Sequence, residues 1–485
     1  MGPQKSIGQP LFKADDLGKP LPDMPHAISV CLPRWADVVG YEEGDSRVVN
    51  AMTTGYPRFF YHQSYRKLCD HYAKAHAKAG EFILVLPSAR TAQQCIEFTG
   101  AGRVAEMDDG VALAIMPKKA EAQAKLFWQH VGQIVTSRQA EDILANRKPP
   151  DGQTPKSRIT KSISSLCGAA EKDIWLFCTG MAAIFTAYEM ITALRGTKTV
   201  QLGFPYVDTY KVQQKFGTGA IYVPFNGPQD LAKLEQVISK DTAAVFCEVP
   251  GNPLLRTVDL PALRKILDKF SVPLIVDDTI GTWLNVDVRP YADVVATSLT
   301  KFYSGVGNVM GGSMILNDKS PHYSALKRSA AEIYEDLVYP ADAVVLAENG
   351  VTFTDRMRTI NDNALKLGEF LRGHPKVANV CYPAFTDRAA YDAVRKPGGG
   401  YGGLMSFTLK DRNKAPVVYD RLTVNKGPSL GTVYTLSGPY TLLAHYNELD
   451  FAAANGVDSH LIRVSVGTEE AQDLIERFSA ALEAA

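Results

Sequence analysis

The sequence lacks net charge, long apolar runs and clustered cysteines, and each absence narrows the class of protein. Its 485 residues hold 52 Lys and Arg against 52 Asp and Glu, so nothing favours a nucleic acid or an anionic membrane as partner. No apolar run approaches the ~18–20 residues needed to span a bilayer. The seven cysteines are scattered without a C-x-x-C pair or a metal-ligand spacing, so we expect a reduced, cytoplasmic protein.

Motifs for metals and nucleotides are also missing. The nine histidines are dispersed and no H-E-x-x-H occurs, so we expect no metal site. The P-loop pattern G-x-x-x-x-G-K-[ST] is absent, which excludes a P-loop nucleoside triphosphatase. No G-x-G-x-x-G opens a helix after a strand, and dinucleotide binding therefore has no support.

The composition is that of a globular protein with two or three domains, and its first half divides into two parts. Apolar residues make up 46% and charged residues 21% of the chain. Residues 1–66 are rich in Pro, Gly and aromatic residues, which predicts an extended N-terminal arm that needs another surface to lie on. Residues 67–158 contain the strand-like EFILVLPS and GVALAIMP and two helix-like stretches, which predict a small inserted α/β unit followed by a turn-rich linker.

The rest of the chain is predicted to be α/β. Over residues 159–315, apolar runs such as DIWLFCTG, AAVFCEVP and PLIVDDT alternate with helical stretches. Continuous apolar strands separated by helices indicate a mostly parallel central sheet buried on both faces. Residues 316–485 begin with a long helical region and end in an amphipathic helix, which predicts a smaller C-terminal α/β domain.

Chemistry-bearing side chains follow the predicted strands, where ligands of open α/β sheets bind. In LFCTGMAAIF, Gly180 and Met181 open a helix and could bind an anion such as phosphate, although a tight turn is the more common explanation of this motif by itself. In LIVDDTIG, Asp277 and Asp278 need a cation or a protonated ring nitrogen, unless they only cap a helix. In FPYVDTYK, Tyr206 could stack on a planar ligand or simply fill a core.

Lys301 in TSLTKFYSG is either a solvated surface charge or a reactive amine. A lysine held in an apolar pocket or beside a cation has a lowered pKa and can form a Schiff base with an aldehyde. Ser298 and Thr300 add hydroxyls beside it. A phosphate cradle, an acid for a ring nitrogen, an amine for an aldehyde and a stacking face together form the set that pyridoxal 5′-phosphate requires.

These residues resemble the Cys/Met-metabolism group of fold-type I pyridoxal-phosphate enzymes, which includes cystathionine γ-synthases and lyases, O-acetylhomoserine sulfhydrylase and methionine γ-lyase. The resemblance runs from about residue 55 to the C-terminus and leaves out roughly 67–160. Lys301 follows Asp277 by 24 residues, in line with the family's spacing of about two dozen. VGYEEGDSRVVNAMTTGYPRFF, DDTIGTWLNVDV, SLTKFYSGVGNVMGGS and PYTLLAHYNEL are most similar to the fungal cystathionine γ-synthase branch.

The resemblance implies roles for residues of the central part of the chain. Lys301 would bind the cofactor aldehyde and shuttle protons, Asp277 would pair with the ring nitrogen, and Tyr206 would stack on the ring. The phosphate would be bound by backbone and hydroxyl groups of Gly180, Met181, Ser298 and Thr300. These assignments predict a fold-type I transferase that depends on pyridoxal phosphate.

The resemblance also implies roles for residues near both ends of the chain. Tyr56 and Arg58 of GYPRFF would reach into a neighbouring subunit's phosphate site, in a dimer or tetramer with shared active sites. Arg463 would bind the substrate α-carboxylate through a bidentate fork, and Ser429 would support Lys301 and that carboxylate. Asn252 would lie near the ring oxygen of the cofactor.

Three departures from the family pattern stand out. The gap from Arg58 to Gly180 is far longer than in the bacterial enzymes and contains the inserted unit, which has no assigned function. The usual Tyr-Gly-Gly-Thr reads Tyr-Val-Asp-Thr here and puts Asp208 beside the stacking tyrosine. The usual Asp-Asn-Thr reads Asp-Asp-Thr, and Asp278 has no assured partner.

The expected reaction is γ-replacement on an O-acyl-L-homoserine through a vinylglycine-type intermediate. The nucleophile would be cysteine or, in a secondary-metabolism paralogue, a carbon acid such as a β-keto acid. Two other reactions stay open, namely γ- or β-elimination by a lyase of sulfur amino acids and an O-acetylhomoserine sulfhydrylase reaction with sulfide. A non-catalytic protein that uses the fold for assembly is a further alternative, against which the joint presence of Lys301, Asp277 and Arg463 argues.

Overall fold

The computed structural model describes residues 9–196 and 198–485, which surround a seven-stranded central sheet. The strand order is β6-β12-β11-β10-β9-β7-β8. All strands run parallel except β12, which is antiparallel to both of its neighbours, so the predicted mostly parallel sheet is confirmed. Its strands are β6 (Ile174–Phe177), β7 (Thr199–Leu202), β8 (Ala220–Val223), β9 (Val245–Glu248), β10 (Leu274–Asp277), β11 (Val294–Thr297) and β12 (Gly312–Leu316).

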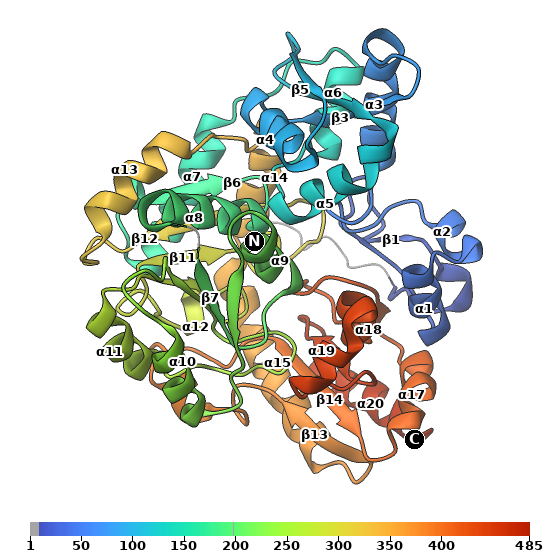
Figure 1. Cartoon of the computed structure of the whole chain (residues 1–485). Helices are drawn as coiled ribbons and strands as arrows, with labels where there is room; N and C mark the ends of the chain where they lie inside the picture. The colour runs from blue at the N-terminus through green and yellow to red at the C-terminus, as the bar shows by residue number, and fades with distance from the viewer. Residues whose placement is uncertain (1–8, 197) are drawn as a thin grey trace.

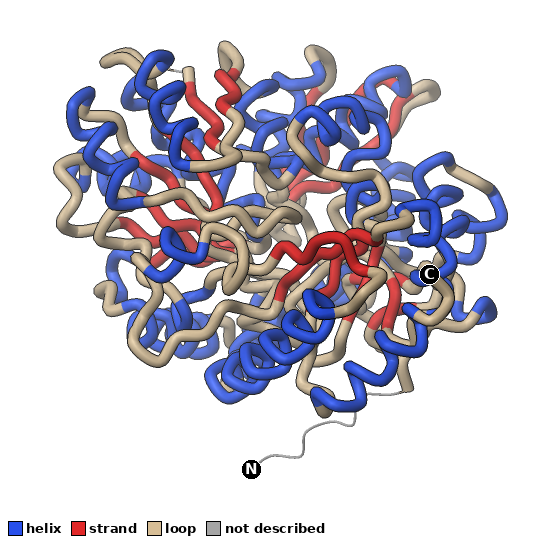
Figure 2. The backbone as a smooth tube through the Cα atoms, turned by 90° about the horizontal axis from the view of Figure 1, so that it is seen from below, coloured by secondary structure: helices blue, strands red, loops and turns tan. Residues whose placement is uncertain are grey.

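Helices bury both faces of this sheet, and successive strand residues divide between the two cores. Val294 and Ala296 of β11 belong to the core with α8 (Gly180–Arg195), α9 (Val207–Lys215) and α13 (Tyr323–Ile333). Val295 between them points to the core with α7 (Gln153–Cys167), α11 (Leu260–Phe270) and α14 (Pro340–Gly350). This alternation is the period of two that strand geometry imposes. Figure 2 shows strands inside a shell of helices.

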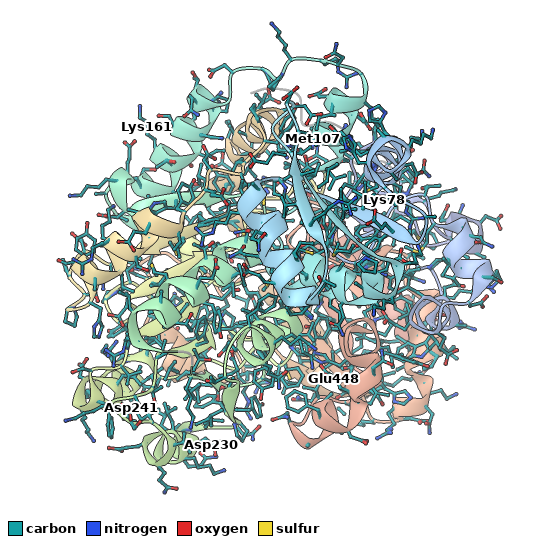
Figure 3. The ribbon with its side chains drawn as sticks, turned by 45° about the horizontal axis from the view of Figure 1, so that its top comes forward. Lys78, Met107, Lys161, Asp230, Asp241 and Glu448 are labelled. Atoms are coloured by element: carbon teal, nitrogen blue, oxygen red, sulfur yellow. The ribbon has the colours of Figure 1, made fainter. Side chains whose placement is uncertain are left out.

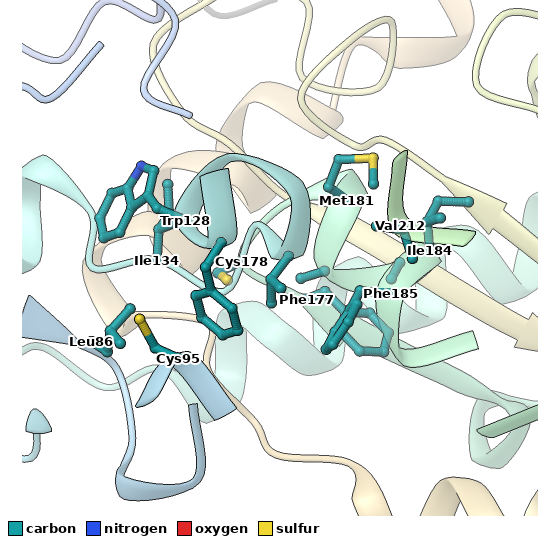
Figure 4. Packing of buried hydrophobic residues seen from close by; sticks show 14 of the residues in the cluster. Leu86, Cys95, Trp128, Ile134, Phe177, Cys178, Met181, Ile184, Phe185 and Val212 are labelled. Atoms are coloured by element: carbon teal, nitrogen blue, oxygen red, sulfur yellow. The ribbon is translucent and has the colours of Figure 1, made fainter. Parts of the chain in front are cut away.

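The inserted unit is a three-stranded antiparallel sheet with helices, at the top of Figure 1. Its strands, in the order β3-β5-β4, are β3 (Glu81–Leu86), β4 (Arg103–Glu106) and β5 (Ala112–Pro117). Its helices are α3 (Gln63–His76), α4 (Ala89–Thr99), α5 (Glu121–Val131) and α6 (Ser137–Leu144). Leu86, Cys95 and Trp128 share one continuous core with Phe177 and Phe185 of the central part (Figure 4).

The C-terminal part follows the central sheet and has a five-stranded sheet of its own, in the order β13-β14-β17-β16-β15. Its strands are β13 (Val377–Cys381), β14 (Leu404–Leu409), β15 (Asn425–Lys426), β16 (Leu436–Gly438) and β17 (Ile462–Ser465). Its helices are α15 (Phe353–Gly373), α16 (Arg388–Asp392), α17 (Ala415–Arg421), α18 (Tyr440–His445), α19 (Leu449–Ala454) and α20 (Ala471–Leu482). No helix in the described ranges has the length and apolarity to cross a membrane.

The N-terminal segment differs from the extended arm that its prolines suggest. It contains a short hairpin, β1 (Pro20–Leu21) and β2 (Ser29–Val30), and two helices, α1 (Trp35–Glu43) and α2 (Ser46–Ala51). Val30, Leu32 and Val38 are buried in one core with Val418 of α17. The Leu32 amide also donates to the carbonyl of Lys426 at 2.9 Å. The surface on which this segment lies is therefore the C-terminal part of its own chain (Figure 1).

Candidate active site

A large cavity lies at the carboxyl ends of the central strands. Its volume is about 1110 Å³, which slightly exceeds the ~300–1,000 Å³ of most small-molecule sites. Glu248 and Asp277, the last residues of β9 and β10, line it from the sheet. The N-terminal segment, the inserted unit and the C-terminal part supply the other walls. The site is therefore where open α/β sheets place their ligands.

Lys301 lies in this cavity and is not a surface charge. Its Nζ is 3.4 Å from the Tyr56 hydroxyl and 3.1 Å from Ser429 Oγ, and lies 4.4 Å from the centre of the Tyr56 ring. Burial lowers the pKa of Lys301, and Tyr56 opposes this shift only in part. A lowered pKa increases the neutral fraction of the amine, which is the nucleophilic and basic form.

Tyr56 is a second proton-transfer group in contact with that amine. Burial by itself would raise the pKa of Tyr56, but the positive charges of Lys301 and Arg58 outweigh it, so that the pKa is lowered. Tyr56 and Lys301 together can therefore hold or exchange one proton at the centre of the cavity.

The N-terminus of α8 forms a cradle for an anion. Thr179 caps the helix by accepting a hydrogen bond from the Ala182 amide at 3.0 Å. The amides of Gly180 and Met181 lie in the first turn, where backbone N–H groups have no intrahelical partners. A Cβ on Gly180 would lie 2.6 Å from the Cβ of Ser298, so only glycine allows this close approach. Gly180, Met181 and Ser298 all line the cavity, as the sequence predicts for phosphate binding.

Thr300, the other predicted phosphate ligand, is placed differently. Its hydroxyl donates to the Gly311 carbonyl at 3.1 Å and accepts from the Gly311 amide at 3.0 Å, and its side chain is buried away from the cavity. The structure thus gives Thr300 the role of closing the loop between β11 and β12. Because both capacities of the hydroxyl are used there, its expected phosphate contact has no support.

Two carboxyl groups, those of Asp277 and Glu248, line the cavity at the ends of β10 and β9. Burial raises the pKa of Asp277, while a 2.9 Å hydrogen bond from the Thr279 amide partly offsets this effect. Burial and the charge of Asp277 raise the pKa of Glu248 to about 8. Neither carboxyl group forms an ion pair within the part of the chain that the structure describes, and a protonated ring nitrogen would supply a cation for them.

Arg463 forms a separate positive site beside Lys301. Its guanidinium donates to the Ser429 carbonyl at 2.6 Å and to Asn252 Oδ1 at 3.4 Å, and lies 4.4 Å from the centre of the Tyr440 ring. Burial lowers its pKa to about 10. No carboxylate in residues 9–196 or 198–485 forms an ion pair with it, so an anionic ligand can take that place.

Ser429 connects Arg463 with the lysine. Its hydroxyl contacts Lys301 and its carbonyl accepts from Arg463. It holds this position with φ of +94°, a backbone conformation that is costly for a residue with a side chain and that tends to occur at functional sites. Asn252 accepts a hydrogen bond from Arg463. It also lines the cavity in which the cofactor ring is expected.

Tyr56 and Arg58 line the cavity within the single chain that the structure describes. Arg58 donates to Asp208 at 2.6 Å and also to the Tyr206 hydroxyl and the Gln129 carbonyl. The inserted unit and α9 thus offer this segment polar partners. The role that the resemblance implies for both residues, in a neighbouring subunit's site, stays a prediction.

Several lining residues were not predicted from the sequence. Glu248 could have been found as the last residue of a predicted strand. The cavity is also lined by Lys211, which pairs with Glu448 at 2.7 Å, and by His445, which contacts Glu448 at 3.0 Å. Glu448 is labelled in Figure 3, on the C-terminal part. His445 and Glu448 both belong to the PYTLLAHYNEL motif, whereas only the tertiary structure brings Lys211 of α9 to them.

The residues present fit pyridoxal phosphate. Lys301 offers an amine with a lowered pKa for the aldehyde, and Asp277 offers an uncompensated carboxylate for the ring nitrogen. The α8 N-terminus with Gly180 offers amides for the phosphate, and the Tyr206 ring lines the same cavity. The aldehyde, the ring nitrogen and the phosphate of the cofactor thus each have a complementary group on the walls.

Comparison with known proteins also indicates a pyridoxal-phosphate-dependent enzyme. Residues 152–483 match the family described as Cys/Met metabolism PLP-dependent enzyme. Residues 64–136, the core of the inserted unit, match the family described as fungal trans-sulfuration enzyme, N-terminal domain.

Individual relatives cover almost the whole chain. A cystathionine gamma-synthase of Neurospora crassa is 34% identical over 97% of this chain and 98% of its own. A cystathionine gamma-synthase-like protein of Aspergillus thermomutatus is 34% identical over 96% and 94%. The crystal structure of cystathionine gamma synthase from Xanthomonas oryzae in complex with aminoacrylate and cysteine aligns with a TM-score of 0.60 and 27% identity, covering 69% of this chain and 86% of that one.

These matches confirm the resemblance, the fold-type I architecture and the pyridoxal-phosphate dependence that the sequence predicts. The match extends over more than half of the chain and includes Lys301, Asp277 and Arg463. The chain therefore belongs to the Cys/Met metabolism family of pyridoxal-phosphate-dependent enzymes.

Proposed function

We propose that this enzyme catalyses γ-replacement on an O-acyl-L-homoserine, with cysteine or a carbon acid such as a β-keto acid as the nucleophile. The observation that carries this proposal is the arrangement of Lys301 and Arg463 on either side of Ser429. It places a basic amine and an unpaired guanidinium at one wall of a single cavity. That is the pair of groups needed to hold an amino acid by its carboxylate and to remove its Cα proton.

Binding of the substrate follows from this geometry. The α-carboxylate would form a bidentate contact with Arg463, whose guanidinium is planar and buried. Stacking of the guanidinium on the Tyr440 ring and its bond to the Ser429 carbonyl fix the plane of the fork. The substrate Cα is then directed toward Lys301, because both groups are held by the same residue, Ser429.

Proton transfer is assigned to Lys301 and Tyr56. When bound, the cofactor would condense with the substrate amine and withdraw electrons, which acidifies the protons on Cα and Cβ. Lys301 would remove the Cα proton, and its lowered pKa suits a group that acts as base and acid in turn. Tyr56, at 3.4 Å from Nζ, would relay the proton as the Cβ–H bond breaks and the acyloxy group leaves Cγ. After the nucleophile adds at Cγ, the protons return by the same route.

The size of the cavity supports replacement by a second substrate. Its volume of about 1110 Å³ has room for a cofactor, an amino acid and a further small molecule. Its lining also includes Lys211, His445 and Glu448, polar groups of both signs that suit a zwitterionic nucleophile such as cysteine. The similarity to the Neurospora crassa cystathionine gamma-synthase favours cysteine as the first nucleophile to test.

Product analysis by mass spectrometry tests this proposal. The purified enzyme is incubated with O-acetyl- or O-succinylhomoserine, alone and with cysteine, sulfide or a β-keto acid, with Lys301→Ala as the inactive control. We expect a γ-substituted amino acid that forms only with enzyme and nucleophile together. An α-keto acid that forms at equal rates with and without nucleophile would identify a lyase and reject γ-replacement, whereas turnover with sulfide alone would identify a sulfhydrylase.

We further propose that the enzyme acts in the cytoplasm as a dimer or tetramer. The basis is the family resemblance, since symmetric self-association is the common state of such enzymes. Light scattering coupled to gel filtration measures the assembly directly, and a mass equal to the 52.9 kDa of one chain would reject it.

A further inference from the structure

Helix α5 of the inserted unit ends against the start of α8. Gly132 terminates α5 with φ of +70°, and its amide donates to the Trp128 carbonyl at 3.2 Å. Its carbonyl accepts from the Thr179 hydroxyl at 2.8 Å and from the Cys178 thiol at 3.4 Å. Thr179 is the capping residue of α8, the helix whose first amides form the anion cradle. The end of α5 is therefore in direct contact with the cap of the cradle.

The contact with Gly132 determines how the Thr179 hydroxyl caps α8. A threonine hydroxyl has one proton to donate. Because this proton goes to the Gly132 carbonyl, the lone pairs of the oxygen remain to accept from the Ala182 amide at 3.0 Å. Thr179 is 1% exposed, so bulk water offers no other partner. Gly132 thus helps to fix the first turn of α8, which contains the amides of Gly180 and Met181.

The close approach of α5 to α8 requires glycine at position 132. A Cβ there would lie 2.5 Å from Thr179 Oγ1 and 2.8 Å from the Met181 Cβ. Gly100, which ends α4 in the same unit with φ of +75°, offers a comparison, since a Cβ there meets no heavy atom of the described chain within 4 Å. The left-handed backbone favours glycine at both helix ends. Only Gly132 adds a contact with the cradle.

An apolar core holds α5 in this place. Trp128 and Ile134, on either side of Gly132 in the sequence, are buried in one core with Cys178 and Met181 (Figure 4). Helix α5 also packs directly on α8 and α9. A close-packed core transmits position, because its side chains have few voids into which to move. The start of α8 therefore depends on where the inserted unit lies.

We propose that the inserted unit positions the phosphate cradle of the cofactor site, with Gly132 and Thr179 as positioning residues. The end of α5 sets the geometry of the first turn of α8, and through it the affinity for the phosphate group of pyridoxal phosphate. This assigns a function to the inserted unit. The inference rests on pyridoxal-phosphate binding in this cavity, involves no residue of the N-terminal segment and does not depend on the reaction that follows.

Titration with two forms of the cofactor tests the proposal. Cofactor-free wild type, Gly132→Ala and Gly100→Ala are each titrated with pyridoxal phosphate and, separately, with pyridoxal, which has the aldehyde and the ring but no phosphate. Borohydride reduction then fixes the bound aldehyde, and intact-chain mass spectrometry gives the labelled fraction, with Lys301→Ala reporting the background at other lysines. Because pyridoxal makes no use of the cradle, the ratio of the two half-saturating concentrations reports on the cradle itself.

We expect Gly132→Ala to need about tenfold or more pyridoxal phosphate than wild type, while its half-saturating concentration of pyridoxal stays within about twofold. Gly100→Ala carries the same backbone strain without the contact and should match wild type with both ligands. A Gly132→Ala chain that binds pyridoxal phosphate as tightly as Gly100→Ala would overturn the proposal. An equal loss of affinity for both ligands would also overturn it, because the substitution would then disturb the whole site and not the cradle.

A second pair of variants guards against a failure of folding. If Gly132→Ala is unfolded by circular dichroism, Thr179→Val, which removes the hydroxyl at similar volume, is compared with Thr179→Ser, which keeps it. We expect a selective loss of pyridoxal-phosphate affinity in Thr179→Val that Thr179→Ser does not show, and equal affinities would reject the proposal. Because labelling is read before any substrate is added, a chain that binds cofactor normally but makes no γ-substituted product would reject the proposed reaction and leave this inference intact.

Discussion

At the scale of single residues, the site depends on how burial shifts proton equilibria. Burial lowers the pKa of Lys301 and raises those of Asp277 and Glu248, which favours the uncharged form of each group around one cavity. Perturbed groups of this kind gather at functional sites. Asp278, next to Asp277, is a different case. It is buried outside the cavity lining and accepts from Thr297 Oγ1 at 2.5 Å, so its effect is on stability.

We predict that Asp278→Asn reduces the pH dependence of stability. Burial raises the pKa of Asp278 from its ordinary 3.8 to about 8. Between these values the folded chain holds a proton that the unfolded chain has lost, so stability falls as pH rises and the loss levels off above about pH 8. The difference in unfolding free energy between pH 6 and pH 8 should shrink by about 2 kcal/mol in the variant.

Urea unfolding at the two pH values measures this difference. Asp241→Asn serves as the control, because Asp241 is exposed on the opposite side of the molecule from the inserted unit (Figure 3). An Asp278→Asn variant with the same pH dependence as wild type would mean that Asp278 is ionised in the folded chain.

At the scale of elements, the start of α8 and the loop after β11 must approach each other closely. Gly180 meets Ser298 at a distance that leaves no room for a side chain. Thr300 closes the loop through both hydrogen bonds to Gly311, which holds Ser298 and Lys301 on either side of it in place. The anion cradle is thus a property of two elements in contact and not of the helix N-terminus alone.

We predict that Gly180→Ala weakens pyridoxal-phosphate binding by about tenfold or more. The added Cβ would lie 2.6 Å from the Ser298 Cβ, which forces the helix start and the loop apart and removes the geometry for phosphate. Absorbance titration of the cofactor-free enzyme measures the change. Gly373→Ala is the matched control, because a Cβ at this last residue of α15 meets nothing within 4 Å. Equal affinities for both variants would show that the close approach is not needed.

At the scale of the whole molecule, four stretches of the chain enclose one cavity. The N-terminal segment packs on the C-terminal part, and the inserted unit shares its core with the central part. Two consequences follow. Tyr56, which lies between these two attachments, is held from both sides. The inserted unit and the central part should also unfold together, because a shared core gives cooperative behaviour.

We predict that Leu86→Ala in β3 destabilises the central sheet as well as the inserted unit. Leu86 is fully buried in the shared core, and its truncation costs about 2–5 kcal/mol. Hydrogen exchange followed by mass spectrometry should show faster exchange in peptides from residues 81–144 and from residues 174–202 together. Leu371→Ala, buried in the separate core of the C-terminal part, is the control. Faster exchange confined to the inserted unit would show that it is an independent domain.

The sequence by itself determined the chemistry and the class of fold. Strand and helix periodicities are local, so they predict a parallel sheet without knowledge of its neighbours. The anion cradle at Gly180, the acid Asp277, the amine Lys301 and the aromatic ring of Tyr206 were enough to predict the cofactor, and the family resemblance added the role of Arg463. These inferences succeed because a Schiff base, a ring-nitrogen acid and a carboxylate fork each require particular residue types.

The tertiary structure alone decided which distant groups meet. Arg58 contacts Gln129 and Asp208, which are 71 and 150 residues away, and no local pattern specifies partners at such separations. The same limit explains why the sequence leaves open the surface on which the N-terminal segment packs, and why the Thr300 hydroxyl is used by Gly311. Periodicity tells which side chains are buried, but only packing tells against what they are buried, because the partners lie far apart in the sequence.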